Sequence, residues 1–346
     1  MKKNIFYALC IILLGYGWKY ASSASHMSIL QMNGIQMGIP YQISVATSFP
    51  EADQSYVIDM IQSVFEEVDT LYNNWNPHSE ISQFNTWPAN LPFTPSPKLH
   101  LFLQKIDRLV RFSEGRFDPT IGPLKTLWLQ ALEKGMFPSQ NAIEEIRPCL
   151  GWEKLRFEGK TISKLDARTQ LDFGGVAKGF CVDLCIEALQ AAGFQNLFVE
   201  WGGEVRCSGQ HPSGRPWKVA IVPPPQFTHT STAVEVELVD AALATSGNYL
   251  QQWEAMGRRF THILDPRTLQ PLEITDQSIA SATLQATDCI TADALSKTLL
   301  LFPEEASAIV WIETRKDFFL KCWLLGSHLL FTRSTEPVTR IPSSTP

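Results

Sequence analysis

Helical periodicity dominates the first half of this chain and strand-like segments dominate the second half, and this segregation constrains the fold more than any other feature. Apolar residues recur at helical spacing over 53–75 and again over 99–112. From residue 197 onward, short β-favouring segments alternate with turns and are interrupted by a helical pattern over 288–301. Helices that precede a series of strands are typical of an α+β fold with mainly antiparallel sheets. The sequence predicts these later strands at 197–201, 217–222, 233–238 and 278–285.

Further elements complete this expectation. A strand is predicted at 41–46 and a helix at 181–191. Three short closing strands are predicted at 308–312, 318–324 and 329–332. A chain of 346 residues with 45% hydrophobic composition can bury a large core, and no repeat or low-complexity linker divides it. We therefore expect one domain over 26–336.

The N-terminus has the features of an export signal. Lys2 and Lys3 precede an apolar run over 5–17, which is short for a membrane span, and small residues follow at 21–25. Residues 1–25 are therefore expected to be a signal peptide or an N-terminal membrane anchor. At the other end, residues 337–346 are expected to form a disordered tail.

Charge and cysteine spacing argue against two classes of partner. The formal net charge is -6, and the 29 Lys and Arg residues are scattered, so no nucleic-acid partner is expected. Cys181 and Cys185 lie four residues apart, but no second pair follows at zinc spacing. They are better interpreted as small packing residues than as metal ligands.

The densest cluster of glycine and polar residues spans 171–180 and reads LDFGGVAKGF. Glycines allow the backbone to approach a ligand closely, and a lysine beside a helix N-terminus can bind phosphate. An ordinary tight turn remains the alternative interpretation. Lys178 is therefore a candidate phosphate ligand, and the sequence alone does not exclude the tight turn.

Two further motifs contain candidate reacting groups. His262 stands in THILDPRT as a candidate general base, although a lone histidine is more often structural. Asp293 and Lys297 lie one helical turn apart in TADALSK, and this spacing is also typical of a surface ion pair. Because Asp293 belongs to an otherwise apolar segment, its carboxylate is expected to face a polar group in the interior, and a hard cation would suit it.

Taken in order along the chain, these motifs resemble the ApbE family of FAD:protein FMN transferases. The resemblance covers nearly the whole chain after the leader, and jointly the motifs are highly specific. They are Met37-Gly38, the segment 75–85, GRFDPTIGPL at 115–124, LDFGGVAKGF, Gly202-Gly203, TSGNY at 245–249, THILDPRT and TADALSK. The resemblance implies the α+β fold of that family, mixed and mainly antiparallel sheets with packed helices, and an FAD substrate with a magnesium ion at its pyrophosphate.

The resemblance also implies roles for individual residues. His262 and Lys178 correspond to catalytic positions, and the backbone oxygen of Ala177, the Asp293 carboxylate and the Lys297 position correspond to the metal site. The implied FAD contacts are Met37, Trp75, Asn76, Ser79, Asp118, Lys178 and Thr245.

This chain departs from the family pattern at the implied metal site. Lys297 stands where the family commonly has a metal-binding Thr, and a charged lysine cannot coordinate magnesium. Either Lys297 supplies part of the cation's charge, or the metal has fewer protein ligands and more water. Smaller departures include Glu204, where Asp is usual after the two glycines.

The implied reaction is a magnesium-dependent transfer of the FMN moiety of FAD to a Thr or Ser hydroxyl of an acceptor protein, with release of AMP. An FAD pyrophosphatase and a non-enzymatic exported flavin-binding protein are the alternatives. The resemblance implies acceptors such as subunits of a sodium-translocating NADH:quinone oxidoreductase. The leader adds an expected location at the bacterial inner membrane or in the periplasm, facing the periplasm, with membrane association through the N-terminus.

Overall fold

The helices and strands below belong to a computed structural model that describes residues 27–224, 233–249, 251–315, 321–326 and 330–334. Its α-helices are α2 (Pro50–Leu71), α3 (Glu80–Thr86), α4 (Pro97–Phe112), α5 (Gly122–Leu132), α6 (Gln140–Ile146), α7 (Ala177–Ala191), α8 (Cys289–Leu300) and α9 (Glu305–Glu313), with short 3₁₀ turns η1 (Arg147–Cys149) and η2 (Trp152–Lys154). Its strands are β1 (Ser28–Gln36), β2 (Ile39–Thr47), β3 (Leu155–Glu158), β4 (Thr161–Lys164), β5 (Leu197–Trp201), β6 (Glu204–Ser208), β7 (Trp217–Ile221), β8 (Val234–Leu238), β9 (Ala241–Gly247), β10 (Gln252–Ala255), β11 (Arg258–Asp265), β12 (Gln270–Glu273), β13 (Ser281–Ala286), β14 (Lys321–Leu325) and β15 (Leu330–Ser334).

Within the described residues, the main sheet has eight strands in the order β1-β2-β5-β6-β9-β13-β14-β15. Every neighbouring pair in it is antiparallel. Smaller sheets pair β10, β11 and β12, β3 with β4, and β7 with β8, again in antiparallel fashion. The predicted α+β class with mainly antiparallel sheets is confirmed.

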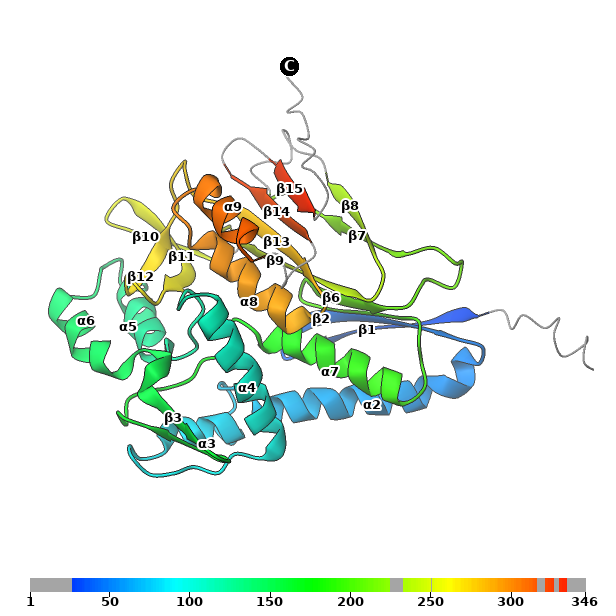
Figure 1. Cartoon of the computed structure of the whole chain (residues 1–346), viewed down its shortest axis with the longest axis horizontal. Helices are drawn as coiled ribbons and strands as arrows, with labels where there is room; N and C mark the ends of the chain where they lie inside the picture. The colour runs from blue at the N-terminus through cyan, green and yellow to red at the C-terminus, as the bar shows by residue number, and fades with distance from the viewer. Residues whose placement is uncertain (1–26, 225–232, 250, 316–320, 327–329, 335–346) are drawn as a thin grey trace, which may run out of the picture.

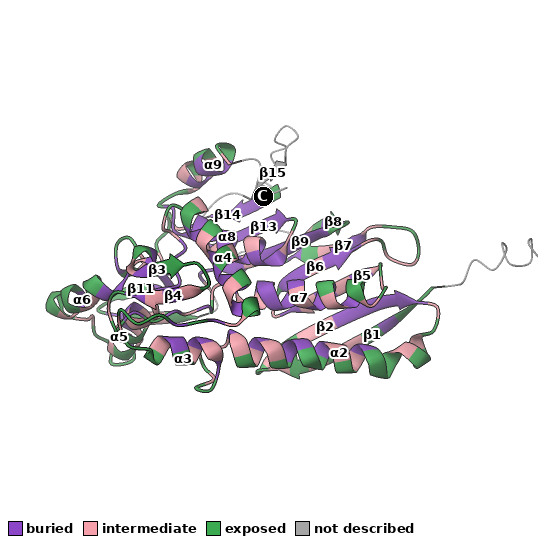
Figure 2. Ribbon diagram, turned by 60° about the horizontal axis from the view of Figure 1, so that its bottom comes forward, coloured by how far each residue is buried: buried purple, intermediate pink, exposed green. Residues whose placement is uncertain are grey.

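Helices α7 and α8 cover one face of this sheet, and α2 runs alongside α7 (Figure 1). The apolar residues of α2 recur at helical spacing and form its buried face, whereas its other face is exposed (Figure 2). Burying each such aliphatic side chain stabilises the fold by about 1.5–3 kcal/mol. The buried residues of α2 are Val57, Ile61, Val64, Phe65 and Val68.

Two features fix α7 against α8. At Gly179 a Cβ atom would lie 2.5 Å from the Cys289 carbonyl oxygen and 2.8 Å from the Cβ of Asp293, so only glycine permits this approach. The buried Asp183 of α7 accepts hydrogen bonds from the backbone N–H groups of Cys289 (2.8 Å) and Ile290 (2.9 Å) at the start of α8. Asp293 is therefore held directly beside the first turn of α7.

The predicted strand at 308–312 is wrong, because this segment lies in helix α9. Its buried residues Ala308, Trp311 and Ile312 are spaced three and one apart, as on one face of a helix. A short apolar run cannot distinguish a strand from a buried helix by periodicity alone. Strand β1 was not predicted at all, since it lies at the sheet edge and is mostly exposed or half-buried.

Some predictions fall wholly or partly on residues that are not described. The leader at 1–25 and the tail at 337–346 lie outside the described residues, as do 318–320 and 329 of two predicted closing strands. The described parts of those strands correspond to β14 and β15. No helix among the described residues is both long enough and apolar enough to span a membrane.

Candidate active site

The LDFGGVAKGF segment leads directly into helix α7, and Lys178 is the second residue of that helix. The Asn85 side chain fastens the beginning of the segment, because it donates to the Leu171 carbonyl (2.9 Å) and accepts from the Leu171 N–H (2.7 Å). Asp172 accepts from the Lys125 ammonium at 2.6 Å. The segment therefore presents Lys178 from a fixed backbone, and its Asp172 holds the ammonium of Lys125 from α5.

Two ion pairs between lysines and buried carboxylates lie at this end of α7. The Lys178 ammonium contacts Glu204, which is 2% exposed, and donates to the Gly202 carbonyl at 3.1 Å. The Lys297 ammonium contacts Asp293, which is 0% exposed. The second Asp293 oxygen accepts from the Gly179 N–H at 3.0 Å. Asp293 is thus interior, as its apolar surroundings in the sequence predicted.

The two pairs influence each other electrostatically. Burial and the neighbouring Asp293 charge raise the pKa of Glu204 to about 7. Burial opposes the charge on Lys178, but Glu204 and Asp293 outweigh it and raise the pKa of Lys178. Lys178 therefore carries its charge at neutral pH, whereas Glu204 is close to its midpoint.

His262 of strand β11 lies close to these lysines. Burial, followed by the charges of Lys297, Lys125 and Lys178, lowers the pKa of His262 to about 4. Its buried Nδ1 atom has no hydrogen-bond partner among the described residues. A neutral imidazole with a free ring nitrogen can accept a proton from a hydroxyl group.

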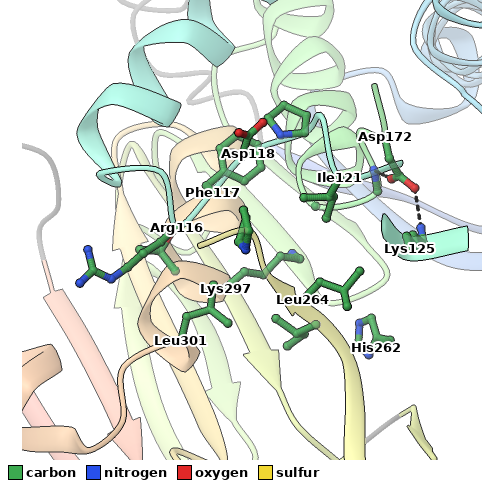
Figure 3. Close-up of a pocket in the computed structure, with 16 residues that line it drawn as sticks. Arg116, Phe117, Asp118, Ile121, Lys125, Asp172, His262, Leu264, Lys297 and Leu301 are labelled. Atoms are coloured by element: carbon green, nitrogen blue, oxygen red, sulfur yellow. Dashed lines mark hydrogen bonds and ion pairs between the residues drawn. The ribbon is translucent and has the colours of Figure 1, made fainter. Parts of the chain in front are cut away.

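Two cavities in the described part of the chain meet at His262. The larger has a volume of about 850 Å³, within the range of small-molecule sites, and is lined by Met37, Trp75, Trp201, Trp253, Ala177 and Lys178. The smaller, of about 130 Å³, is lined by Arg116, Phe117, Asp118 and Lys297 among others. Figure 3 shows Lys297 extending between Phe117 and Leu264 in the smaller cavity. Both cavities share Lys125, Gly174, His262 and Leu264.

The rim of the larger cavity carries exposed apolar side chains. Met37 stands in the β1–β2 turn with a φ of 51° and is followed by Gly38 at 75°. Trp75 is 74% exposed, and the Lys125 ammonium lies 5.2 Å from the centre of its ring. An exposed tryptophan beside an ammonium offers a flat surface for an aromatic ligand.

The structure separates the predicted FAD contacts into two groups. Met37, Trp75 and Lys178 line the larger cavity, and Asp118 lines the smaller one, although its carboxylate accepts from the N–H groups of Thr120 and Trp152, both at 2.9 Å. The remaining three line neither of these cavities and bond within the protein. They are Asn76, which donates to Asp69, Ser79, which caps α3, and Thr245, which bonds to Thr283.

Three residues at the site were not identified as candidates from the sequence. Lys125 follows the GRFDPTIGPL motif directly, and Glu204 follows the two glycines. Their positions next to these motifs could have identified both as candidates. Asp183 had no signal, because its role depends on the contact between α7 and α8.

Comparison with known proteins agrees with this geometry. A family model described as the ApbE family matches residues 37–319. The FAD:protein FMN transferase of Chlamydia pneumoniae is 40% identical over 284 residues, which cover 82% of this chain and 88% of that protein. The corresponding Vibrio cholerae protein is 33% identical over 310 residues, covering 89% of this chain and 90% of that protein.

Solved structures give the same assignment. The Pseudomonas stutzeri flavinyl transferase ApbE, in its apo form, has a TM-score of 0.76 and 27% identity, covering 89% of this chain and 95% of that one. The Vibrio cholerae flavin transferase ApbE has a TM-score of 0.73 and 29% identity, covering 92% and 98%. This chain therefore belongs to the ApbE family and is an enzyme of the FAD:protein FMN transferase class.

Proposed function

We propose that this chain transfers the FMN moiety of FAD to a Thr or Ser hydroxyl of an acceptor protein and releases AMP. One observation carries the proposal: the charges of Lys125, Lys178 and Lys297 act together on His262, where the two cavities meet. A dinucleotide that occupies both cavities has its pyrophosphate at this junction. Three ammonium groups there would attract the anion, and the neutral imidazole would serve as the base.

The bond changes follow from this arrangement. The acceptor oxygen forms a bond to the FMN phosphorus while its proton passes to His262. The bond from that phosphorus to the bridging oxygen breaks, and AMP leaves with the bonding electrons. Fixed positive charges stabilise the negative charge that develops on the phosphoryl and leaving oxygens, which is the main requirement of phosphoryl transfer.

The side chains around Asp293 do not fit a magnesium ion as they are arranged. Both carboxylate oxygens already accept hydrogen bonds, one from Gly179 and one from the Lys297 ammonium. In the described part of the chain, no three His, Cys, Asp or Glu side chains gather into a group that could hold a metal ion. Magnesium prefers oxygen ligands and is repelled by an adjacent ammonium. The predicted magnesium site at Ala177, Asp293 and Lys297 therefore carries no step of the proposed reaction.

Partner and location form part of the same proposal. The class of enzyme requires an acceptor protein. The resemblance supports a flavin-carrying membrane complex, such as a sodium-translocating NADH:quinone oxidoreductase, as the source of that acceptor. The N-terminal sequence supports export, and thus action on the periplasmic side of the bacterial inner membrane.

Incubating the purified chain with FAD and an acceptor protein tests the proposed reaction. The expected result is flavin fluorescence that stays with the denatured acceptor, together with one AMP per flavin transferred. Free FMN and AMP without labelled acceptor would instead indicate a pyrophosphatase. Bound but unchanged FAD would indicate a flavin-binding protein without this activity.

A further inference from the structure

Lys297 and Asp293 form an ion pair within a single helix, and Lys297 lines the smaller cavity. The ammonium contacts the Asp293 carboxylate and lies 3.4 Å from the Asp293 backbone oxygen. We propose that the Lys297 ammonium replaces a divalent cation at Asp293, so that this chain holds the FAD pyrophosphate with fixed lysine charges. This inference rests on the proposed function.

Accessibility supports the replacement. Asp293 has no exposed surface, whereas the Lys297 side chain is 22% exposed and lines the smaller cavity. The ammonium therefore stands between the carboxylate and the space that a ligand enters. A metal ion from solution could reach Asp293 only by displacing Lys297, and the displaced ammonium would remain close enough to repel the ion.

Packing holds Lys297 in this place. A Cβ atom at Gly175 would lie 3.5 Å from the Lys297 Cδ atom, so the glycine segment runs along the lysine stem at van der Waals distance. The lysine stem also extends between Phe117 and Leu264 (Figure 3). Both partners of the pair stand on α8, one turn apart, so no domain movement is needed to bring them together.

The remaining charges favour an anion at the junction over a second cation. Lys178 and Lys125 are each paired with one carboxylate, Glu204 and Asp172 respectively. An ammonium has three N–H donors, so each lysine can keep its carboxylate and still donate to a phosphate oxygen. A pyrophosphate would thus meet three charged donors, whereas a divalent cation would meet three carboxylates that are each already paired with an ammonium.

The consequence is that FAD affinity does not depend on a divalent cation. Calorimetric titration of the full chain with FAD, once in EDTA and once in magnesium chloride, should give the same Kd. Titration with magnesium chloride alone should give no binding heat. A Kd that weakens clearly in EDTA, or a saturable magnesium heat without FAD, overturns the inference.

Lys297→Thr provides the complementary test, because it removes the ammonium and leaves a hydroxyl beside Asp293. We expect FAD affinity in EDTA to fall by roughly tenfold, the scale of one lost charged hydrogen bond, and to recover in magnesium chloride. An EDTA-insensitive affinity in this variant contradicts the inference. If the variant does not fold, the wild-type titrations decide the question alone.

A matched control and a transfer assay separate this inference from the proposed function. Lys105→Thr removes a lysine of α4 that faces the Phe180 ring and lines neither cavity, so it should behave like wild type in both titrations. Transfer to an acceptor that persists in EDTA supports both proposals. Transfer that requires magnesium overturns only the role of Lys297, and absence of transfer under both conditions overturns the proposed function.

Discussion

The two ion pairs, of which Lys297 lines the smaller cavity and Lys178 the larger, are built in different ways. Lys297 and Asp293 stand four residues apart on α8, so the helix itself brings them together. Lys178 and Glu204 belong to α7 and β6, and only the packing of that helix on the sheet joins them. The first pair is a local structure that tertiary contacts bury, whereas the second is a product of the fold. The first should therefore tolerate small displacements between α7 and the sheet better than the second.

The largest effect is expected at His262, because the charges of Lys297 and Lys178, one from each ion pair, both act on this side chain. His262→Ala should lower the rate of transfer by roughly 10²- to 10⁴-fold, the usual contribution of a positioned general base. FAD affinity should change little, because the lysines remain. Single-turnover transfer and calorimetry measure the two quantities.

The control for this prediction is His211→Ala, since His211 bonds to Ser213 and lines neither cavity. It should transfer FMN at the wild-type rate. Equal rates for His262→Ala and wild type would remove His262 from the reaction.

Lys178→Met breaks the pair that depends on tertiary structure. The pKa of Glu204 is raised to about 7 from its ordinary 4.5, so the folded state binds a proton that the unfolded state has lost, and stability falls as pH rises between these values. Removing Lys178 raises the Glu204 pKa further and extends this loss to higher pH. The destabilisation relative to wild type should be small at about pH 6 and approach about 1.4 kcal/mol at about pH 8, because pH 8 is one unit above the wild-type Glu204 pKa and the variant keeps Glu204 protonated there.

Urea unfolding of Lys178→Met and wild type at both pH values measures this difference. Lys178→Gln is the matched variant, because it keeps a hydrogen-bond donor without the charge. A pH-independent cost for Lys178→Met would show that Glu204 does not titrate in the folded protein.

Gly179→Ala disturbs the packing of α7, which carries Lys178, against α8, which carries the Lys297–Asp293 pair. Its Cβ would lie 2.5 Å from the Cys289 oxygen. We expect a loss of about 1–3 kcal/mol in the free energy of unfolding, as for other overpacked sites, with slower transfer. Gly175→Ala is the matched change, since its Cβ would meet Phe117 and Lys297 only at 3.4 and 3.5 Å. Thermal unfolding should show at most a small loss for Gly175→Ala, and equal losses would contradict the assigned contact.

The smallest expected effect concerns the pKa of His262, which burial and the charges of three lysines lower. Without ligand its pKa is lowered to about 4, so His262 should stay neutral from about pH 5 upward. The pyrophosphate of bound FAD offsets the lysine charges and should raise this pKa by roughly one unit or more. NMR titration of the imidazole with and without FAD measures the shift. An unchanged pKa would place the pyrophosphate away from the junction.

Much of the fold could be predicted because its elements carry clear periodicity. The apolar spacing over 53–75 identified α2, although the helix ends at Leu71 and the prediction ran to residue 75. The strands predicted at 197–201 and 217–222 were confirmed as β5 and β7. Two of the failures have clear physical reasons. The α9 segment is as short as a strand, and β1 takes its place from pairing with β2 rather than from a buried face of its own.

The candidate site was less predictable, because its charges come from separate segments. Lys178, His262 and Asp293 could be named individually, but nothing in the sequence joined Glu204 to Lys178 or placed Lys125 beside Trp75. Ser79 and Asn76 show the converse case: their polar side chains bond inside the protein and line neither cavity, so their role in FAD binding stays a prediction.

The sequence by itself determined the local terms: which segments are helical, that α7 begins beside a glycine-rich turn, and that Lys297 reaches Asp293 across one helical turn. These follow from backbone geometry, which acts over a few residues. Only the tertiary structure decided that Asp293 is fully buried, that Glu204 faces Lys178, and that the charges of three lysines act on His262. Burial and charge proximity depend on which distant segments meet, and here that depends on the glycine contact that lets α7 and α8 pack together on the sheet.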